Sequence, residues 1–338
     1  MRLFSILALL AGLGLAAALI AASGIASVGE AVASAGWGVA LVAVVRAVQI
    51  FGAGAAWWLL FRPASRPRLE ACGLVRWIRE AVNNLLPVAQ VGGDVLGARL
   101  LGFFGVDWPL AAASVVADML VQVATQFLFA VLGFLVLIGL GGEGGLVRGV
   151  AIGLLIAAPA IAGFYLVQRR ATHRLLRRLL IRLIGRRRWM ALGAVEALYD
   201  GLESIHTNAG GLALGIAVHL AVWIYGTLEI WIALDFMGWP VGFAEALVIE
   251  SLTQAVKGAG FMVPGALGIQ EGGFVALCAV FGIPAPTALA LSLVKRVADA
   301  VVGVPGLLAW QALEGHRLWR RSAGERGARP VRPEDIPG

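Results

Sequence analysis

Two stretches of similar design, NNLLPVAQVGGD from Asn83 to Asp94 and VPGALGIQEGG from Val263 to Gly273, each place proline, glycine and an acid inside an apolar region. At a constant offset of 177 residues, and without a gap, Pro87 aligns with Pro264 and Asp94 aligns with Glu271. The same alignment pairs further positions, namely Phe104-Gly105-Val106 with Phe281-Gly282-Ile283, and Pro109 with Pro286. Coincident prolines, acids and glycines are harder to obtain by chance than shared apolar positions, so the pattern predicts an internal duplication.

The composition around these stretches is that of a membrane protein. Of 338 residues, 60% are hydrophobic and only 14% are charged, which is far from the usual range for soluble domains. The apolar residues form runs of about 20, the length at which a helix crosses a bilayer core of about 30 Å. We therefore predict an all-α polytopic membrane protein with about six full spans, at residues 3–23, 37–61, 110–140, 147–168, 211–235 and 286–311.

The first span, 3–23, follows a single Arg2 and could be taken for a signal peptide. It is about 20 residues long, it lacks a convincing small-residue cleavage pattern, and further spans follow it. We expect it to be a retained helix.

The distribution of arginine predicts the orientation of the spans. Three basic regions, at 62–79, at 169–188 and after Trp310, are expected to be cytoplasmic by the positive-inside rule, whereas the loops 24–36, 141–146 and 236–242 contain no Lys or Arg. Both termini are then cytoplasmic. The run from Arg169 to Arg188 also has the pattern of a basic amphipathic helix that lies along an anionic membrane surface.

The two interrupted stretches, 74–104 and 243–283, are predicted to be broken or re-entrant helical elements. The orientation requires each of them to enter and leave on one side, the first from the cytoplasm and the second from outside. Irregular backbone at membrane depth normally lines a cavity, because its polar groups would otherwise be unpaired in lipid. Each element could instead be a pair of full, tilted spans, which preserves the same orientation.

Together these features predict an inverted internal repeat, with elements at about 74–140 and 243–311, inside one transmembrane domain at 1–313. Transporters of this architecture place a substrate site near the bilayer midplane, between discontinuous helices. An old duplication retained only for packing is the alternative. A basic cytoplasmic loop at 169–208 and a polar, disordered cytoplasmic tail at 314–338 complete the expected organisation.

Within the first element, amides and a flexible turn precede an acid. Pro87 removes a backbone donor, and Gly92-Gly93 permits a sharp turn, so the freed backbone groups and amides could hold a polar lipid headgroup. Asp94 and Arg99 could pair with each other, and a purely structural ion pair is the alternative.

The second element repeats this plan with Gln270-Glu271 at the turn. Glu250, Lys257 and Pro264 are spaced by seven residues and share one helical face, so all three could line one cavity. An ionisable side chain within a span is costly and marks a functional site by default.

Other intramembrane charges belong to the same hypothesis. Lys295 and Asp299 have the i, i+4 spacing of an ion pair, and Arg296 could meet a phosphate. Arg46 is expected to meet one of the acids in the spans, and Asp118 to lie near a membrane interface. The predicted substrate-binding residues are Asn83, Asn84, Pro87, Gln90, Gly92, Gly93, Asp94, Arg99, Glu250, Lys257, Pro264, Gly265, Gly268, Gln270, Glu271, Lys295, Arg296 and Asp299.

Several classes of function are disfavoured. The net charge of +7 comes from basic residues between apolar runs, which argues against nucleic-acid binding. The two cysteines lie in different halves and the four histidines are scattered, so we expect no disulfide, metal or cofactor. The sequence contains no Walker motif or hydrolase elbow and does not indicate an ATP-driven pump.

The two elements and the following segment GIPAPTALALSLVKRVADAVVGVPG resemble the lysylphosphatidylglycerol synthase transmembrane (flippase-like) family, and the stretch Gln90–Arg99 resembles its hopanoid-biosynthesis-associated subgroup. The resemblance covers about residues 37–310. Its motif positions are Pro87, Gly92, Gly93 and Asp94 in the first element, and Pro264, Gly265, Gly268, Glu271 and Arg296 in the second.

The resemblance implies a bacterial inner-membrane protein that handles or translocates a lipid. Hopanoids or anionic phospholipids would be its ligands, and proteins of hopanoid biosynthesis or transport its partners. Synthases of this family carry an aminoacyl transferase domain after the membrane part, and we expect that activity to be absent here. The alternatives are an intramembrane lipid-modifying enzyme, with Asp94 or Glu271 as general base, and a scaffold for hopanoid enzymes.

Overall fold

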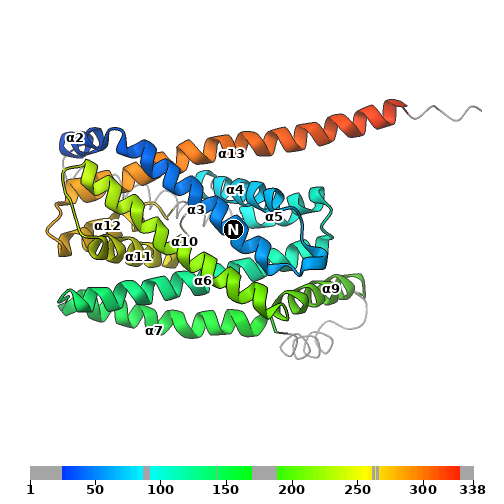
Figure 1. The fold of residues 1–338 in the computed structure, drawn as a ribbon, viewed down its shortest axis with the longest axis horizontal. Coiled ribbons are helices and arrows are strands. Elements are labelled where there is room, and N and C mark those ends of the chain that lie inside the picture. Colours follow the sequence, from blue (N-terminus) through cyan, green and yellow to red (C-terminus); the bar gives the residue numbers. More distant parts are fainter. Residues whose placement is uncertain are drawn as a thin grey trace, which may run out of the picture.

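A computed structural model describes residues 25–86, 92–142, 144–169, 189–260, 263 and 266–327, and within these ranges all regular structure is helical (Figure 1). Two short 3-10 turns, Pro63–Ser65 and Gly102–Phe104, join longer helices. The α-helices are α2 (Ile25–Ala35), α3 (Gly38–Leu60), α4 (Leu69–Leu85), α5 (Gly92–Leu101), α6 (Trp108–Gly139), α7 (Gly144–Val167), α9 (Trp189–His206), α10 (Ala209–Phe236), α11 (Phe243–Ala259), α12 (Ile269–Val280) and α13 (Ala285–Gly327).

Four of these helices, α3, α6, α7 and α10, are long and apolar enough to cross a membrane. They correspond to the predicted spans 37–61, 110–140, 147–168 and 211–235, and the prediction of a polytopic helical membrane protein is confirmed. The predicted span 286–311 lies within α13, where Lys295, Arg296 and Asp299 interrupt the apolar run. The predicted span 3–23 and the basic run 170–188 lie outside the described residues.

The two interrupted stretches form two pairs of short helices, α4–α5 and α11–α12. Helices α5 and α12 begin at Gly92 and Ile269, and the long helices that follow begin at Trp108 and Ala285, so both pairs of helix starts are 177 residues apart. At about 1.5 Å per residue, the 10 residues of α5 and the 12 of α12 are too short to cross a bilayer core of about 30 Å. Their lengths favour broken, re-entrant elements over pairs of full spans.

The arrangement of the helices is that of an inverted repeat. In Figure 1, α6 and α13 run in opposite directions, and α4–α5 and α11–α12 occupy opposite halves of the molecule. Helix α3 packs against α10 at the centre, α4 packs against α13, and α11 packs against α6. This set of neighbours is unchanged when α3 is exchanged with α10, α4 with α11, and α6 with α13.

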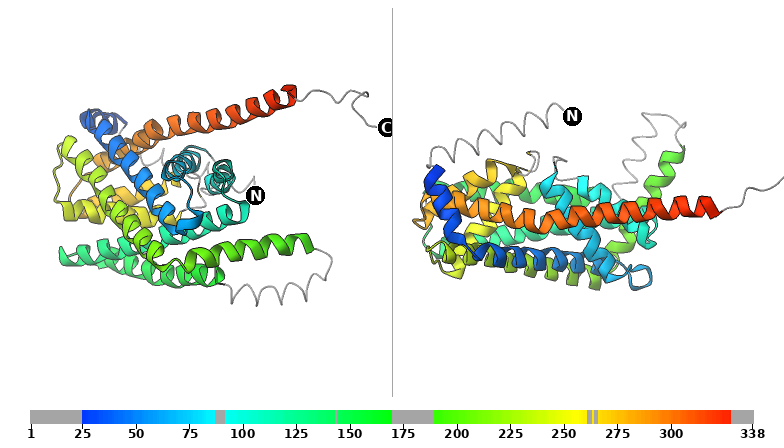
Figure 2. Two further views of the ribbon diagram at one scale, coloured as in Figure 1. Left: turned by 45° about the vertical axis from the view of Figure 1, so that its right-hand side comes forward. Right: turned by 90° about the horizontal axis from the view of Figure 1, so that it is seen from above.

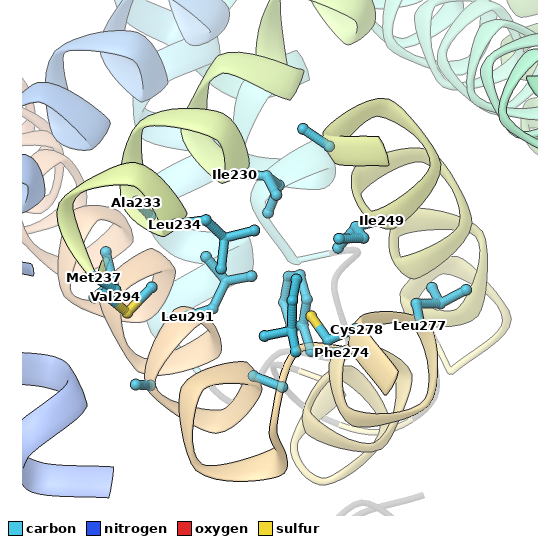
Figure 3. Packing of buried hydrophobic residues seen from close by; sticks show 14 of the residues in the cluster. Ile230, Ala233, Leu234, Met237, Ile249, Phe274, Leu277, Cys278, Leu291 and Val294 are labelled. Carbon is cyan, nitrogen blue, oxygen red and sulfur yellow. The ribbon is translucent and has the colours of Figure 1, made fainter. Parts of the chain in front are cut away.

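Each half has its own apolar core. In one half, α10, α11, α12 and α13 bring together Ile230, Ile249, Phe274 and Leu291, all of which are buried (Figure 3). The matching core between α3, α4, α5 and α6 contains Trp57, Cys72, Ile78, Leu100 and Val115. Each pair of short helices also packs against the long helices, since α4 contacts α13, α5 contacts α6, α11 contacts α6 and α12 contacts α13.

Helix α13 continues beyond the other helices (Figures 1 and 2). The sequence predicts a polar, disordered tail from residue 314, and the structure describes α13 as far as Gly327. Leucine, alanine, glutamate and arginine are frequent after Trp310 and no proline occurs before Pro330, so the local sequence sustains a helix. Residues 328–338 lie outside the described part of the chain.

Helices α3 and α4 cross at a pair of glycines. A Cβ atom added at Gly54 would lie 2.9 Å from the Cα of Gly73, and this backbone contact cannot be relieved by moving a side chain. We expect Gly54→Ala to lower the free energy of unfolding in detergent by about 1–3 kcal/mol. Gly163→Ala is the control, because a Cβ at Gly163 meets no described atom within 4 Å. Equal stability of the two variants would contradict this packing.

Candidate functional site

A cavity of about 990 Å³ lies between the two halves of the bundle. Helices α3, α4, α5, α6, α7, α10, α11 and α12 all contribute to its lining. Its polar lining residues are Arg46, Gln49, Arg76, Arg79, Glu80, Asn83, Asn84, Asp94, Gln122, Gln126, His219, Gln254 and Lys257. A cavity with both polar and apolar walls within a membrane protein is suited to a ligand that has a polar and an apolar part.

The apolar wall comes from α7. Its main neighbour is α6, beside which it lies at one edge of the bundle, and α7, all of which the structure describes, has no fully buried residue (Figures 1 and 2). Gly145, Gly149 and Gly153 line the cavity at four-residue intervals, together with Leu146 and Val150. This spacing places them on one helical face, and the missing side chains leave room in front of it.

A polar part of the cavity lining is built around Asp94 at the start of α5. Arg79 of α4 donates from Nε to Asp94 Oδ1 over 3.1 Å, and Asn83 Nδ2 donates to Asp94 Oδ2 over 3.3 Å. The backbone N–H of Gly93 donates to Asn83 Oδ1 over 2.8 Å. A Cβ at Gly93 would collide with the backbone of Arg79 and with Asn83, so this position requires glycine. The structure thus brings together the predicted residues Asn83, Gly93 and Asp94.

Asp118 of α6 is the centre of the same network. Its Oδ2 accepts from Arg76 Nη1 and Arg79 Nη1 over 2.9 Å each and from Gln122 Nε2 over 2.9 Å, while His219 Nε2 lies 3.2 Å from Oδ1. Asp118 is fully buried. The sequence predicts Asp118 near a membrane interface, and in the structure its carboxylate is enclosed within the bundle, where it pairs with two arginines.

The sequence places Arg76 and Arg79 in a basic cytoplasmic loop, and the structure places them in a helix. Both lie on α4 and are buried. Arg76 additionally pairs with Glu80 over 2.8 Å, and the guanidinium of Arg79 lies 4.6 Å from the centre of the Trp57 ring. Acidic and aromatic partners offset the cost of removing these charges from water, so these two arginines belong to a buried helix and not to a loop.

A second buried network lies around Lys295 of α13. Lys295 Nζ lies 2.8 Å from Glu229 Oε2 and 2.7 Å from Glu250 Oε2. Arg46 pairs with the same Glu229 and with Asp299, at 3.0 Å each, which confirms the expectation that it meets an acid. The predicted Lys295–Asp299 pair is wrong, because both side chains are bound to residues on other helices.

Glu271 is held in a third cluster. Its Oε2 accepts from the Gly268 backbone N–H over 2.7 Å, which caps α12, and its Oε1 accepts from Ser292 Oγ over 2.9 Å and from Arg296 Nε over 2.8 Å. Gln270 donates to the same Ser292 hydroxyl over 2.9 Å. Arg296 therefore binds a carboxylate of the protein. Glu271 lies outside the cavity lining that the structure describes, although the equivalent Asp94 lies within it.

The remaining predicted residues divide into four groups. Arg99 is exposed and pairs with Glu314 over 3.0 Å, so the possible Arg99–Asp94 pair does not form. Asn84 and Lys257 line the cavity, whereas Glu250, Lys295 and Asp299 lie outside its described lining. Pro87, Gln90, Pro264 and Gly265 fall outside the described residues.

Sequence reasoning did not select Arg76, Arg79, Gln122 or His219 for the site. One signal could have found two of them, because Arg76, Arg79 and Asn83 follow the i, i+3, i+7 spacing of a single helical face just before Pro87. Gln122 and His219 carry no such signal, since their role depends on which helices meet at Asp118.

The fold and the cavity define a polytopic helical membrane protein with a charged, partly apolar chamber between two inverted halves. The family model described as the lysylphosphatidylglycerol synthase TM region matches residues 6–306, and the chain belongs to this family. A function connected with membrane lipids follows from this membership. No curated protein and no solved structure gives a significant match.

Proposed function

We propose that the protein translocates a polar lipid between the leaflets of the bacterial inner membrane, with the headgroup held in the central cavity. The observation that carries this proposal is the division of the cavity between the charged wall at Asp94 and the glycine-rich apolar face of α7. A headgroup could contact the charged wall while its acyl chains pass along α7. The inverted pairs α4–α5 and α11–α12 would open the cavity to each leaflet in turn.

Both charge networks support a transport role over a purely structural one. Arg46, Arg76 and Arg79 face the cavity although each is held by acids. A protein that acted only as a scaffold would not need a cavity beside these buried arginines, whose charges are costly to place inside a membrane. Hopanoids and anionic phospholipids are the proposed cargo classes. By the distribution of arginine, we propose that both termini are cytoplasmic.

Filling the cavity tests the function. A Cβ at Gly153 meets no described atom within 4 Å, so Gly153→Phe should fold and project a ring into the cavity. In proteoliposomes with a fluorescent phospholipid, we expect this variant to slow translocation by about tenfold, equivalent to about 1.4 kcal/mol in the barrier. Dithionite quenching of the outer leaflet measures the rate.

Gly163→Phe is the matched control. It makes the same change on the same helix at a glycine that also has open space, but it lies outside the cavity lining described in the structure. We expect it to retain the wild-type rate. Equal rates for Gly153→Phe and wild type, or no translocation by wild type of either a phospholipid or a hopanoid probe, would contradict the proposal.

A further inference from the structure

Lys257 differs from the other cations of the cavity. It lies in the last turn of α11 and lines the cavity, yet it makes no hydrogen bond or salt bridge with any residue in the described part of the chain. The three cavity arginines, by contrast, each bind at least one acid, with Glu229 and Asp299 held by Arg46, Asp118 by Arg76, and Asp94 by Arg79.

The acids near Lys257 are already occupied. Asp299 is the nearby acid that acts on it electrostatically, but the Asp299 carboxylate is bound to Arg46 over 3.0 Å. Glu250, two turns earlier on α11, is bound to Lys295 over 2.7 Å and to Gln254 over 2.8 Å. Three further charged groups that act on Lys257, namely Arg46, Lys295 and Arg296, are cations. Asp299 and Glu250 are thus each bound to a cation other than Lys257.

We infer that Lys257 is the residue of the cavity that binds the phosphate group of a phospholipid ligand. An ammonium group at membrane depth is costly without a counter-charge, and phosphate is a strong acceptor for the three donors of lysine. This inference rests on the proposed function and narrows its cargo, because an uncharged polar lipid would leave Lys257 without a partner.

The same cavity lining contains polar and apolar groups that could contact the rest of a phospholipid. The phosphate would bind Lys257 of α11. The side-chain amides of Asn84 and Gln126, which also line the cavity, could donate hydrogen bonds to the rest of the headgroup. Leu146, Val150 and Leu154 of α7 supply apolar surface for the chains.

Equilibrium binding to the purified full-length protein in detergent tests this inference independently of transport. The probes are dihexanoylphosphatidylglycerol, inorganic phosphate and dihexanoylglycerol, which separate a lipid phosphate, a free phosphate and an uncharged lipid. We expect the first to bind most tightly. Lys257→Gln should weaken its binding by about 10- to 100-fold, the loss of one charge-assisted hydrogen-bonding group. Lys257→Arg should stay within about threefold of wild type, since a phosphate accepts from either cation.

Arg148→Gln is the control, because Arg148 is an exposed cation of α7 outside the described cavity lining. Its binding should equal that of wild type. Equal binding of dihexanoylglycerol and dihexanoylphosphatidylglycerol, or unchanged binding in Lys257→Gln, would overturn the phosphate assignment even if translocation persists. Inorganic phosphate that binds as tightly as the lipid would overturn the lipid assignment. Binding that depends on Lys257 without translocation of any lipid would uphold this inference and contradict the proposed function.

Discussion

Asp118→Asn is expected to lower the free energy of unfolding by about 3–5 kcal/mol, because it leaves buried arginines without their shared counter-charge. The Asp118 carboxylate binds both Arg76 and Arg79 at 2.9 Å, and all three side chains are buried. Asparagine has nearly the same shape, so the loss reflects charge and not volume. Unfolding of the purified protein by SDS in mixed micelles measures the change.

Glu314→Gln provides the comparison for this variant. It removes the acid of the Arg99–Glu314 pair, whose arginine is 58% exposed, and such pairs contribute about 0–1 kcal/mol. We therefore expect a change of about 1 kcal/mol or less. A loss in Asp118→Asn no larger than that in Glu314→Gln would show that the Asp118 network does not stabilise the half formed by α3, α4, α5 and α6.

Lys295→Met is expected to have an effect of similar size, about 3–5 kcal/mol, because it leaves the carboxylates of Glu229 and Glu250 without their common cation. Both acids lie within 2.8 Å of Lys295 Nζ and both are buried. Methionine keeps an unbranched side chain of similar length, so packing is largely preserved.

The double variant Lys295→Met/Glu250→Gln separates charge from packing. It removes the Glu250 carboxylate, which lacks its cation in Lys295→Met, while Glu229 keeps its pair with Arg46 at 3.0 Å. We expect the double variant to be more stable than Lys295→Met alone, which gives a coupling energy of about 1–3 kcal/mol in the double-mutant cycle. Additive losses would mean that Lys295 and Glu250 do not interact in the folded protein.

The fold could be predicted from sequence to the extent that it depends on apolar runs and on the repeat. The offset that aligns Pro87 with Pro264 also relates the starts of α5 and α12, and of α6 and α13. Proline and paired glycines disrupt helices wherever they occur, so the positions of the breaks are a local property of the chain.

The partners of the buried charges could not be predicted in the same way. Asp118 and Lys295 are 177 residues apart, and each is the centre of a network in its own half, but with opposite charge. The repeat therefore keeps the position of the central charge and reverses its sign. Which acid meets which base depends on contacts between helices distant in sequence, such as α4 with α6, and helical spacing carries no information about these contacts.

For the same reason, the sequence indicates which predicted residues lie together only where they are close in the chain. Asn83, Gly93 and Asp94 are close in sequence and form one local turn, so the structure brings them together. Glu271 occupies the equivalent position but is enclosed by Ser292 and Arg296 of α13, and the described cavity extends along α7 on the other side of the bundle. Sequence symmetry did not indicate that only one of the two acids faces the cavity.

We expect a lipid headgroup to occupy the cavity between the two halves. Photo-cross-linking of the membrane-embedded protein with a phosphatidylglycerol analogue that carries a diazirine in its headgroup, followed by peptide mapping, tests it directly. We expect adducts on cavity residues of α4, α6 and α11, such as Asn84, Gln126 and Lys257, which decrease in Gly153→Phe but not in Gly163→Phe. Adducts confined to outward-facing residues such as Leu155 and Ile156, with none on the cavity wall, would contradict it.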